Sequence, residues 1–164
     1  MDVLKLAQGR KVMKDLQQIE RIKRLKYRYM RALDLKQWDE LADCFTEDAV
    51  TDYDSGKYSF QGKKNIIDFL LQFMDRPTQI GQHHVHHPEI DLTSDTTAKG
   101  TWYLQDFVID LDANTTLRGA AFYHDEYEKV DGQWKIKRTG YDRTYEEVEE
   151  RSDKIKLTAN IFSK

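Results

Sequence analysis

The chain has 164 residues, of which 34% are charged and 39% hydrophobic, and its formal net charge is −3. This balance is typical of one soluble globular domain. The weak negative charge argues against a nucleic-acid partner, and the first residues carry no sustained apolar run that would predict a signal peptide or a membrane span. Cys44, the single cysteine, cannot form an internal disulfide, which favours a reducing, cytoplasmic compartment. Its apolar neighbours in "LADCF" predict that it is a small core residue.

Helical periodicity dominates the first half of the chain, where apolar residues recur at three- and four-residue steps. The first and longest such series is Val12, Leu16, Ile19, Ile22, Leu25, Tyr29 and Ala32. A second, shorter helix is expected to carry Trp38, Leu41, Ala42 and Phe45 on one side. A third spans 66–74, and Pro77 helps to end it.

Strand patterns replace the helical ones after Pro77. Residues 83–92, 98–112, 117–130 and 133–147 are separated by turn sequences, of which Asp131-Gly132 is a hairpin signal. Two shorter strands are expected between the second and third helices, around the turn 54–56. Helices followed by long, mostly antiparallel strands predict an α+β domain with helices packed on one face of a curved sheet. We expect one domain over 1–164, with its core at about 15–146 and a tail from 147 onward.

Four of the five histidines gather in "GQHHVHHPEIDL", residues 81–92. Alternation along a strand would place His83 and His87 on one side and His84 and His86 on the other. One interpretation makes His84 and His86 a metal-binding pair, but further ligands would have to come from carboxylates elsewhere. Another leaves all four in solvent. In the third, one histidine faces the inside of the sheet and is polarised by a buried carboxylate.

A candidate for that carboxylate is Asp106 in "TWYLQDFVID". It shares a strand face with Trp102, Leu104 and Val108, so it is an acidic group on an otherwise apolar face. A buried carboxylate without a partner is unfavourable, and a histidine would relieve that cost. If instead the strand twists so that this end is exposed to solvent, Asp106 has no special role.

Two further stretches place polar groups beside aromatic ones. Tyr29 and Asp34, near the end of the first predicted helix, are five residues apart and so do not share a helical face. Asp34 therefore belongs to the helix end or the loop beyond it, where capping the next helix is the ordinary role of an aspartate. In the last strand Tyr141, Arg143 and Tyr145 alternate onto one face, so Arg143 is either stacked on tyrosine at the surface or part of a site.

These residues together carry a family resemblance. The segment "RYMRALDLKQWDELADCFTEDA" resembles the opening of the SnoaL-like, NTF2-like superfamily. The segments "HHPEI", "TTAKGTWYLQD" and "GAAFYHDEYEKVDGQWKIKRTGYDRTYEE" are similar to the bile acid 7α-dehydratases within it. The similarity covers nearly the whole chain apart from the first residues and the tail. His84, His87, the loop "DLDANTTLRG" and the tail depart from the pattern.

The resemblance implies a cone-shaped α+β barrel, formed by N-terminal helices and a strongly curved sheet that encloses a pocket. It implies a set of catalytic residues: Tyr29, Asp34, His83, Asp106 and Arg143. It places Tyr53 in the pocket wall, and the aromatic residues Trp102 and Tyr141 would suit a flat polycyclic ligand. His83 is then the working imidazole, and the other histidines are bystanders.

The resemblance implies an elimination of water from a hydroxy-ketone, and the residue types fit such a reaction. His83 would take the proton and return it to the leaving hydroxyl, Asp106 would orient His83, and Asp34 would lie near the same ring. Tyr29 would donate a hydrogen bond to the developing enolate oxygen, and Arg143 would hold Asp106 or the substrate. We expect no cofactor and no metal.

Three functional hypotheses remain at this point. The first is a lyase that acts on a small, hydrophobic, steroid-like or polycyclic substrate. The second is another pocket enzyme of this fold, such as a ketosteroid-type isomerase or a polyketide cyclase. The third is a protein that binds a small molecule without catalysis, since fold does not determine function. The resemblance also implies a homo-oligomer, with a trimer the expected state, and the apolar "IKLTANIF" tail could cover a neighbouring subunit.

Overall fold

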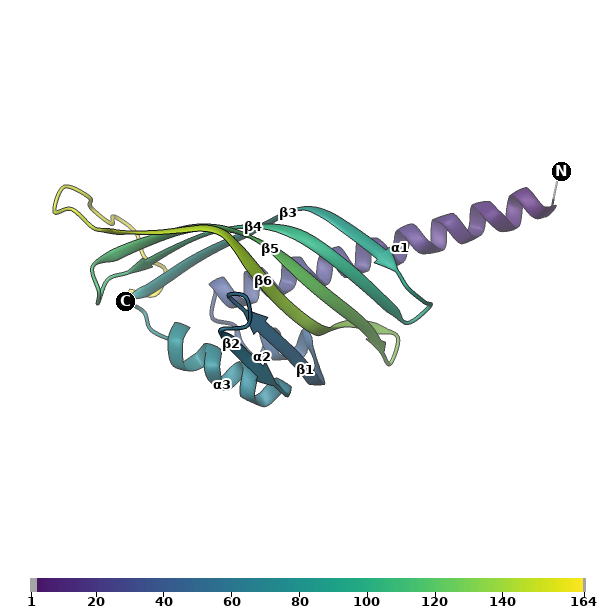
Figure 1. Cartoon of the computed structure of the whole chain (residues 1–164), viewed down its shortest axis with the longest axis horizontal. Coiled ribbons are helices and arrows are strands. Elements are labelled where there is room, and N and C mark those ends of the chain that lie inside the picture. The colour runs from purple at the N-terminus through teal and green to yellow at the C-terminus, as the bar shows by residue number, and fades with distance from the viewer. Residues whose placement is uncertain (1–2, 164) are drawn as a thin grey trace.

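The computed structural model describes residues 3–163, with three helices that precede most of a six-stranded sheet (Figure 1). The helices are α1 (Val3–Asp34), α2 (Trp38–Asp43) and α3 (Lys63–Met74). The strands are β1 (Phe45–Tyr53), β2 (Tyr58–Gln61), β3 (Gln79–Leu92), β4 (Thr97–Asp110), β5 (Thr115–Val130) and β6 (Gln133–Glu150). The expected order of helices and strands is therefore confirmed.

The sheet has the strand order β2-β1-β6-β5-β4-β3, and neighbouring strands are antiparallel except for the parallel pair β1–β6. It is strongly curved and cone-like but does not close into a barrel (Figure 1). The buried core contains residues of all three helices together with alternate residues of the strands. This is the α+β arrangement that the sequence predicted, with a cone that stays open.

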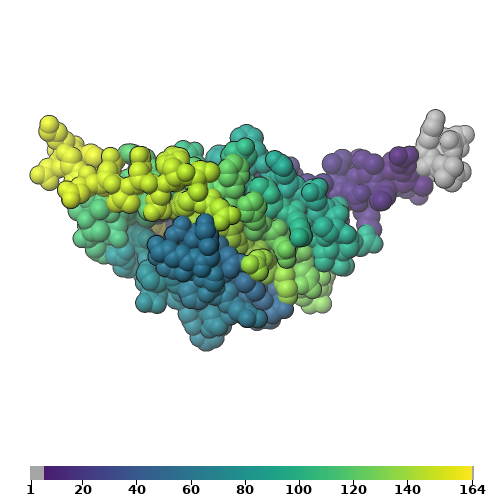
Figure 2. All heavy atoms as spheres, viewed as in Figure 1, coloured from purple at the N-terminus to yellow at the C-terminus, as the bar shows by residue number. Residues whose placement is uncertain are grey.

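Helix α1 packs on the sheet along only part of its length. Ile22 and Leu25 are buried, whereas Val12 and Leu16 are 51% and 55% exposed. Figure 2 shows the N-terminal part of the helix protruding from the body of the molecule. The predicted apolar stripe of this helix therefore extends beyond the surface that covers it within this chain.

A β-bulge between His86 and Glu89 interrupts the alternation of side chains along β3. His87 lies in this bulge with a φ of 47°, in the left-handed region, and its side chain is exposed. The expectation that His87 shares the inward face of His83 is therefore wrong. Simple period-2 alternation holds from His83 to His86 and fails at the extra residue.

Cys44 confirms the prediction of a core position, because its side chain is fully buried. Burial raises the pKa of this thiol to about 11, so it is a thiol and not a thiolate at neutral pH. Among the helices that the structure describes, none combines the length and apolar character needed to cross a membrane.

The parallel pairing of β1 with β6 depends on a close backbone approach at Gly140. A Cβ atom at this position would lie 2.5 Å from the carbonyl oxygen of Asp52 on β1. We predict that Gly140→Ala lowers the free energy of unfolding by about 1–3 kcal/mol, because the two strands must move apart. Urea unfolding followed by circular dichroism measures this change.

The matched control is Gly9→Ala on α1, where an added Cβ meets nothing within 4 Å. This substitution should leave stability unchanged or raise it by up to about 1 kcal/mol, because alanine favours the helix. Equal unfolding midpoints for the two variants would contradict the account of Gly140.

Candidate active site

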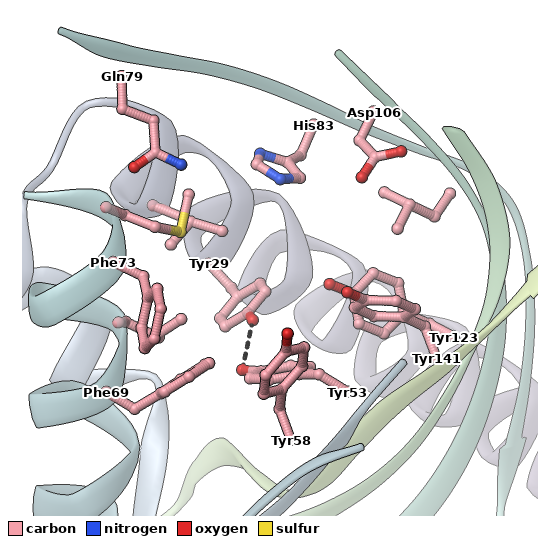
Figure 3. Close-up of a pocket in the computed structure, with 14 residues that line it drawn as sticks. Tyr29, Tyr53, Tyr58, Phe69, Phe73, Gln79, His83, Asp106, Tyr123 and Tyr141 are labelled. Carbon is pink, nitrogen blue, oxygen red and sulfur yellow. Dashed lines mark hydrogen bonds between the residues drawn. The ribbon is translucent and has the colours of Figure 1, made fainter. Parts of the chain in front are cut away.

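A cavity of about 260 Å³ lies between the helices and the concave face of the sheet (Figure 3). Helices α1 and α3 and all six strands contribute to its lining. The lining residues are Tyr29, Leu33, Tyr53, Tyr58, Phe69, Leu70, Phe73, Met74, Gln79, His83, Leu104, Asp106, Tyr123 and Tyr141. In Figure 3, His83 and Asp106 lie on one side of the cavity, and Tyr53, Tyr58, Tyr123 and Tyr141 lie on the other.

Asp34 holds His83 at two points. Its Oδ1 atom lies 2.5 Å from Nδ1 of the His83 ring, and its Oδ2 atom accepts the backbone N–H of His83 at 2.9 Å. A carboxylate accepts hydrogen bonds, so it favours the form of the ring with a proton on Nδ1. The other nitrogen, Nε2, is then the one that remains for a ligand in the cavity that His83 lines.

Two features of the chain make this contact possible. Asp34 is the last residue of α1, and α1 packs against β3, which carries His83. Gly81, two residues before His83 on the same strand face, leaves space for both side chains. A Cβ atom on Gly81 would lie 3.1 Å from the His83 ring and 3.3 Å from Oδ1 of Asp34. A larger residue at position 81 would therefore press on the pair.

Asp106 pairs with Arg143 and not with the imidazole. The two Nη atoms of Arg143 donate to the two carboxylate oxygens of Asp106 at 2.7 and 2.8 Å. The contact crosses β5 above Gly119, where a Cβ atom would lie 2.4 Å from the guanidinium. Burial alone would lower the pKa of Arg143, but the hydrogen bonds and charge of Asp106 outweigh it and raise that pKa. Arg143 is thus a permanent cation.

The expected assignment of the two carboxylates is therefore corrected. Asp106 stands opposite His83 in the β3–β4 register, but its oxygens are bonded to Arg143. Asp34 is the carboxylate that orients the ring. The sequence indicated that Asp106, if buried, would need a partner, and the structure shows that it is buried. The identity of the partner depends on the packing of β4, β5 and β6, which brings Arg143 to it. The suggestion that Arg143 could hold Asp106 agrees with this arrangement.

Buried phenols form the opposite wall. The hydroxyl oxygens of Tyr29 and Tyr53 are 2.9 Å apart, and Tyr123 lies beside them. Burial raises the pKa of each of these three tyrosines well above 10, and it raises the pKa of Tyr141 to about 12. These groups are neutral hydrogen-bond donors at every physiological pH. A ligand oxygen that becomes negative would find donors here and no competing anion among the tyrosines.

Most of the predicted site residues meet at this cavity. Five line it directly: Tyr29, Tyr53, His83, Asp106 and Tyr141. Asp34 and Arg143 hold two of these five from behind.

Trp102 lies elsewhere. It is fully buried, it donates from Nε1 to the Tyr127 hydroxyl at 2.9 Å, and it packs edge-on against Tyr27. Trp102 shares the strand face of Asp106, but four residues along a strand is a distance of about 13 Å.

Sequence reasoning missed Tyr123 and the aromatic side of α3. Tyr123 alternates with Ala121 and Asp125 on the buried face of β5, a period-2 signal that was present in the sequence. Phe69 and Phe73 are one helical turn apart, with ring centroids separated by 4.8 Å, and both line the cavity. Their four-residue spacing is typical of one helix face but does not distinguish a cavity wall from solid core.

The remaining histidines of β3 stay apart from this site. His84, His86 and His87 are exposed, and the ring centroid of His86 lies about 6 Å from that of His84 and about 6 Å from that of His87. Over the part of the chain that the structure describes, no group of three or more His, Cys, Asp or Glu residues is arranged to hold a metal ion.

The raised tyrosine pKa values predict that the protein loses stability in alkali. Below about pH 10 the phenols are neutral in both folded and unfolded chains, so their contribution is fully present there. Above pH 10 the unfolded chain ionises first, and we expect the free energy of unfolding to fall by more than about 1.4 kcal/mol per pH unit. Lys26, whose pKa is lowered by burial, acts in the opposite direction but is a single group.

Urea unfolding at about pH 9 and about pH 11 measures this slope. Tyr53→Phe should reduce the slope, because it removes one buried phenol from the comparison. Tyr103→Phe, at a position that is 47% exposed, is the matched control. If both variants change the slope equally, the loss of stability does not come from the buried cluster.

Comparisons with known proteins agree with this architecture. The model of the SnoaL-like domain family matches residues 14–140. A protein described as a scytalone dehydratase from Novosphingobium aromaticivorans is 25% identical, with a TM-score of 0.77 over 91% of this chain and 95% of that one. Hexachlorocyclohexane dehydrochlorinase LinA-type3 from Novosphingobium barchaimii LL02 is 19% identical, with a TM-score of 0.76 over 90% and 98%. Because the family match spans most of the chain, including the Asp34–His83 pair, this protein belongs to the SnoaL-like domain family and has its NTF2-like fold.

Proposed function

We propose that this protein is a lyase that eliminates water from a flat, polycyclic hydroxy-ketone without a cofactor. The observation that carries the proposal is an imidazole oriented by a carboxylate that faces neutral phenol donors across an apolar cavity. An elimination needs a base for the proton, an acid for the departing hydroxyl and a donor for the enolate oxygen. The side chains supply all three groups.

The reaction begins when Nε2 of His83 removes a proton from the carbon next to the carbonyl, or from its vinylogous position. The electrons of the broken C–H bond move toward the carbonyl oxygen, which accepts a hydrogen bond from Tyr29. The enolate then collapses, a C=C bond forms and the C–O bond to the hydroxyl breaks. The imidazolium, stabilised by Asp34, returns its proton to the hydroxyl, and water leaves. The protein ends in its starting form.

The other pocket groups act on substrate position. The Asp106–Arg143 pair is close to neutral overall, so it offers polar contacts to a substrate hydroxyl and no strong preference for an anion. Tyr53, Tyr141, Phe69 and Phe73 present aromatic surface that suits flat rings. We therefore favour an uncharged, steroid-like substrate of the kind that a 7α-dehydratase takes.

Similarity to the protein described as a scytalone dehydratase supports an elimination over an isomerisation, because a dehydratase removes water. Its 25% identity leaves the substrate of this chain open. Product analysis distinguishes the reactions. A dehydration lengthens the conjugated chromophore and removes the mass of water, whereas an isomerisation or a cyclisation that loses no atoms keeps the mass.

Turnover of 7-hydroxy-3-oxo-Δ4-steroids and smaller hydroxy-ketones, followed by absorbance and mass spectrometry, tests the proposal. We expect His83→Ala to lower kcat by about 10²–10⁴-fold, because it removes the group that moves the proton. Asp34→Asn should lower kcat by at least about 10-fold, since the ring loses its orientation and its charge partner. Treatment with a chelator should leave the activity unchanged.

The matched control is His84→Ala, the adjacent histidine on the exposed face of the same strand. It should retain wild-type turnover. The double variant His83→Ala/Asp34→Asn should be little slower than His83→Ala alone, because the two residues act as one unit. Independent, multiplicative losses would contradict the Asp34–His83 pair, and an unchanged product mass would contradict dehydration.

We further propose that the chain assembles as a trimer. Apolar side chains of the C-terminal tail are exposed, with Ile155 at 51% and Ile161 at 77%, and Tyr103 is exposed on the outer face of the sheet. Surfaces of this kind are typical of contacts between subunits. Light scattering at micromolar concentration should give three times the chain mass of 19.5 kDa.

A variant with Ile155→Asp and Ile161→Asp should dissociate, whereas Val130→Asp, at an exposed apolar position at the end of β5, should not. A monomer in the wild-type protein would refute the trimer.

A further inference from the structure

A second buried ion pair lies beneath the tyrosine wall, outside the groups that the proposed elimination uses. Lys26 on α1 and Asp125 on β5 have fully buried side chains, and Nζ of Lys26 is 2.8 Å from Oδ2 of Asp125. Asp125 also accepts hydrogen bonds from the hydroxyls of Thr139 at 2.7 Å and Tyr127 at 2.6 Å. The carboxylate is therefore fully engaged.

Such a pair contributes little to stability by itself. Burial lowers the pKa of Lys26, although the charge and hydrogen bond of Asp125 oppose that shift. Removing two charges from water costs several kcal/mol per ion, and well-packed apolar residues often replace a buried pair without loss of stability. The position of the ammonium group suggests another role for it.

The ammonium group of Lys26 lies directly on the face of a tyrosine that lines the cavity. Its Nζ atom is 3.5 Å from the ring centroid of Tyr123 and 5.0 Å from that of Tyr29. Lys26 and Tyr29 are three residues apart, so they share one face of α1. A cation at this distance interacts strongly with the electron-rich face of an aromatic ring, especially when the contact is shielded from water.

We propose that Lys26, held in place by Asp125, is a positioning residue that fixes Tyr123 and Tyr29 with their hydroxyls in the cavity and strengthens them as hydrogen-bond donors to a negative ligand oxygen. Positive charge on the ring face draws electron density from the phenol oxygen. The phenol then gains more from a hydrogen bond to an oxyanion than to a neutral oxygen. Lys26 acts through the rings and does not line the cavity.

This inference rests on the proposed role of the tyrosines but is tested without turnover. The probe is a nitronaphthol, a planar bicyclic phenol that ionises near neutral pH and absorbs differently as phenol and as phenolate. Its spectrum in the pocket gives the preference of the protein for the phenolate over the phenol. We expect a clear preference in the wild-type protein, and Tyr123→Phe should reduce it.

The informative variant is Lys26→Met/Asp125→Asn, which removes both charges and keeps the side-chain sizes close. Lys26→Met alone leaves Asp125 buried without its cation and is expected to unfold more readily. We expect the phenolate preference to fall by about 10-fold in the double variant. Lys26→Arg keeps the charge and should retain most of the preference.

Tyr127→Phe is the matched control, because it removes a hydrogen bond to the same Asp125 oxygen that Lys26 contacts and keeps the ammonium group. It should lose stability yet keep the phenolate preference within about 2-fold. The inference is overturned if the wild-type protein has no phenolate preference or if the double variant keeps that preference. It is also overturned if Tyr127→Phe reduces the phenolate preference as much as the double variant does. Absence of turnover with every hydroxy-ketone would leave these spectra, and hence this result, unaffected.

Discussion

Removal of carboxylates from water is the constraint on which the inner face of this molecule depends. Three aspartates, Asp34, Asp106 and Asp125, lie on that face, with side chains that are 21%, 4% and 0% exposed. Each would be unfavourable without a partner, and each is paired with a basic side chain: His83, Arg143 and Lys26, respectively. The partners come from different elements, so each pair also joins two parts of the fold.

The three pairs divide the cavity into regions of different chemistry. Asp34 with His83 supplies the imidazole of the proposed elimination, whereas Asp106 with Arg143 supplies an ion pair with two parallel hydrogen bonds. Asp125 with Lys26 lies behind the phenols and out of contact with the lumen. Glycine makes the first two arrangements possible, because Gly81 and Gly119 leave room where any side chain would meet the pair.

The sequence predicted the elements well because their signals are local. Periodicity identified the helices, and alternation identified the strand face that carries Asp106. Two features of the structure could not be predicted from local sequence patterns. The bulge at His87 depends on backbone conformation, and the exchange of partners between Asp34 and Asp106 depends on where α1 ends against β3. A carboxylate on an apolar strand face indicates that a partner is needed, but the sequence pattern does not identify that partner.

Lys26 and Asp125 illustrate the same limit. Lys26 lies on the apolar face of its helix, and Asp125 alternates between two buried tyrosines, so each carried the signal that singled out Asp106. The residues are 99 positions apart, and only the packing of α1 on β5 and β6 brings them together. The ion pair between them could therefore not be predicted from local sequence patterns.

The parallel pairing of β1 with β6 has a consequence for how the cavity forms. Strands β3 to β6 follow one another in sequence and join through short turns, so this meander can assemble from local contacts. β1 instead meets β6 across a long stretch of chain, at Asp52 and Gly140, and non-local pairings of this kind form slowly. Tyr53 stands at the end of β1. The wall of phenols is therefore complete only when this most distant strand pairing of the sheet is in place, whereas the contact between Asp34 and His83 involves neither β1 nor β6.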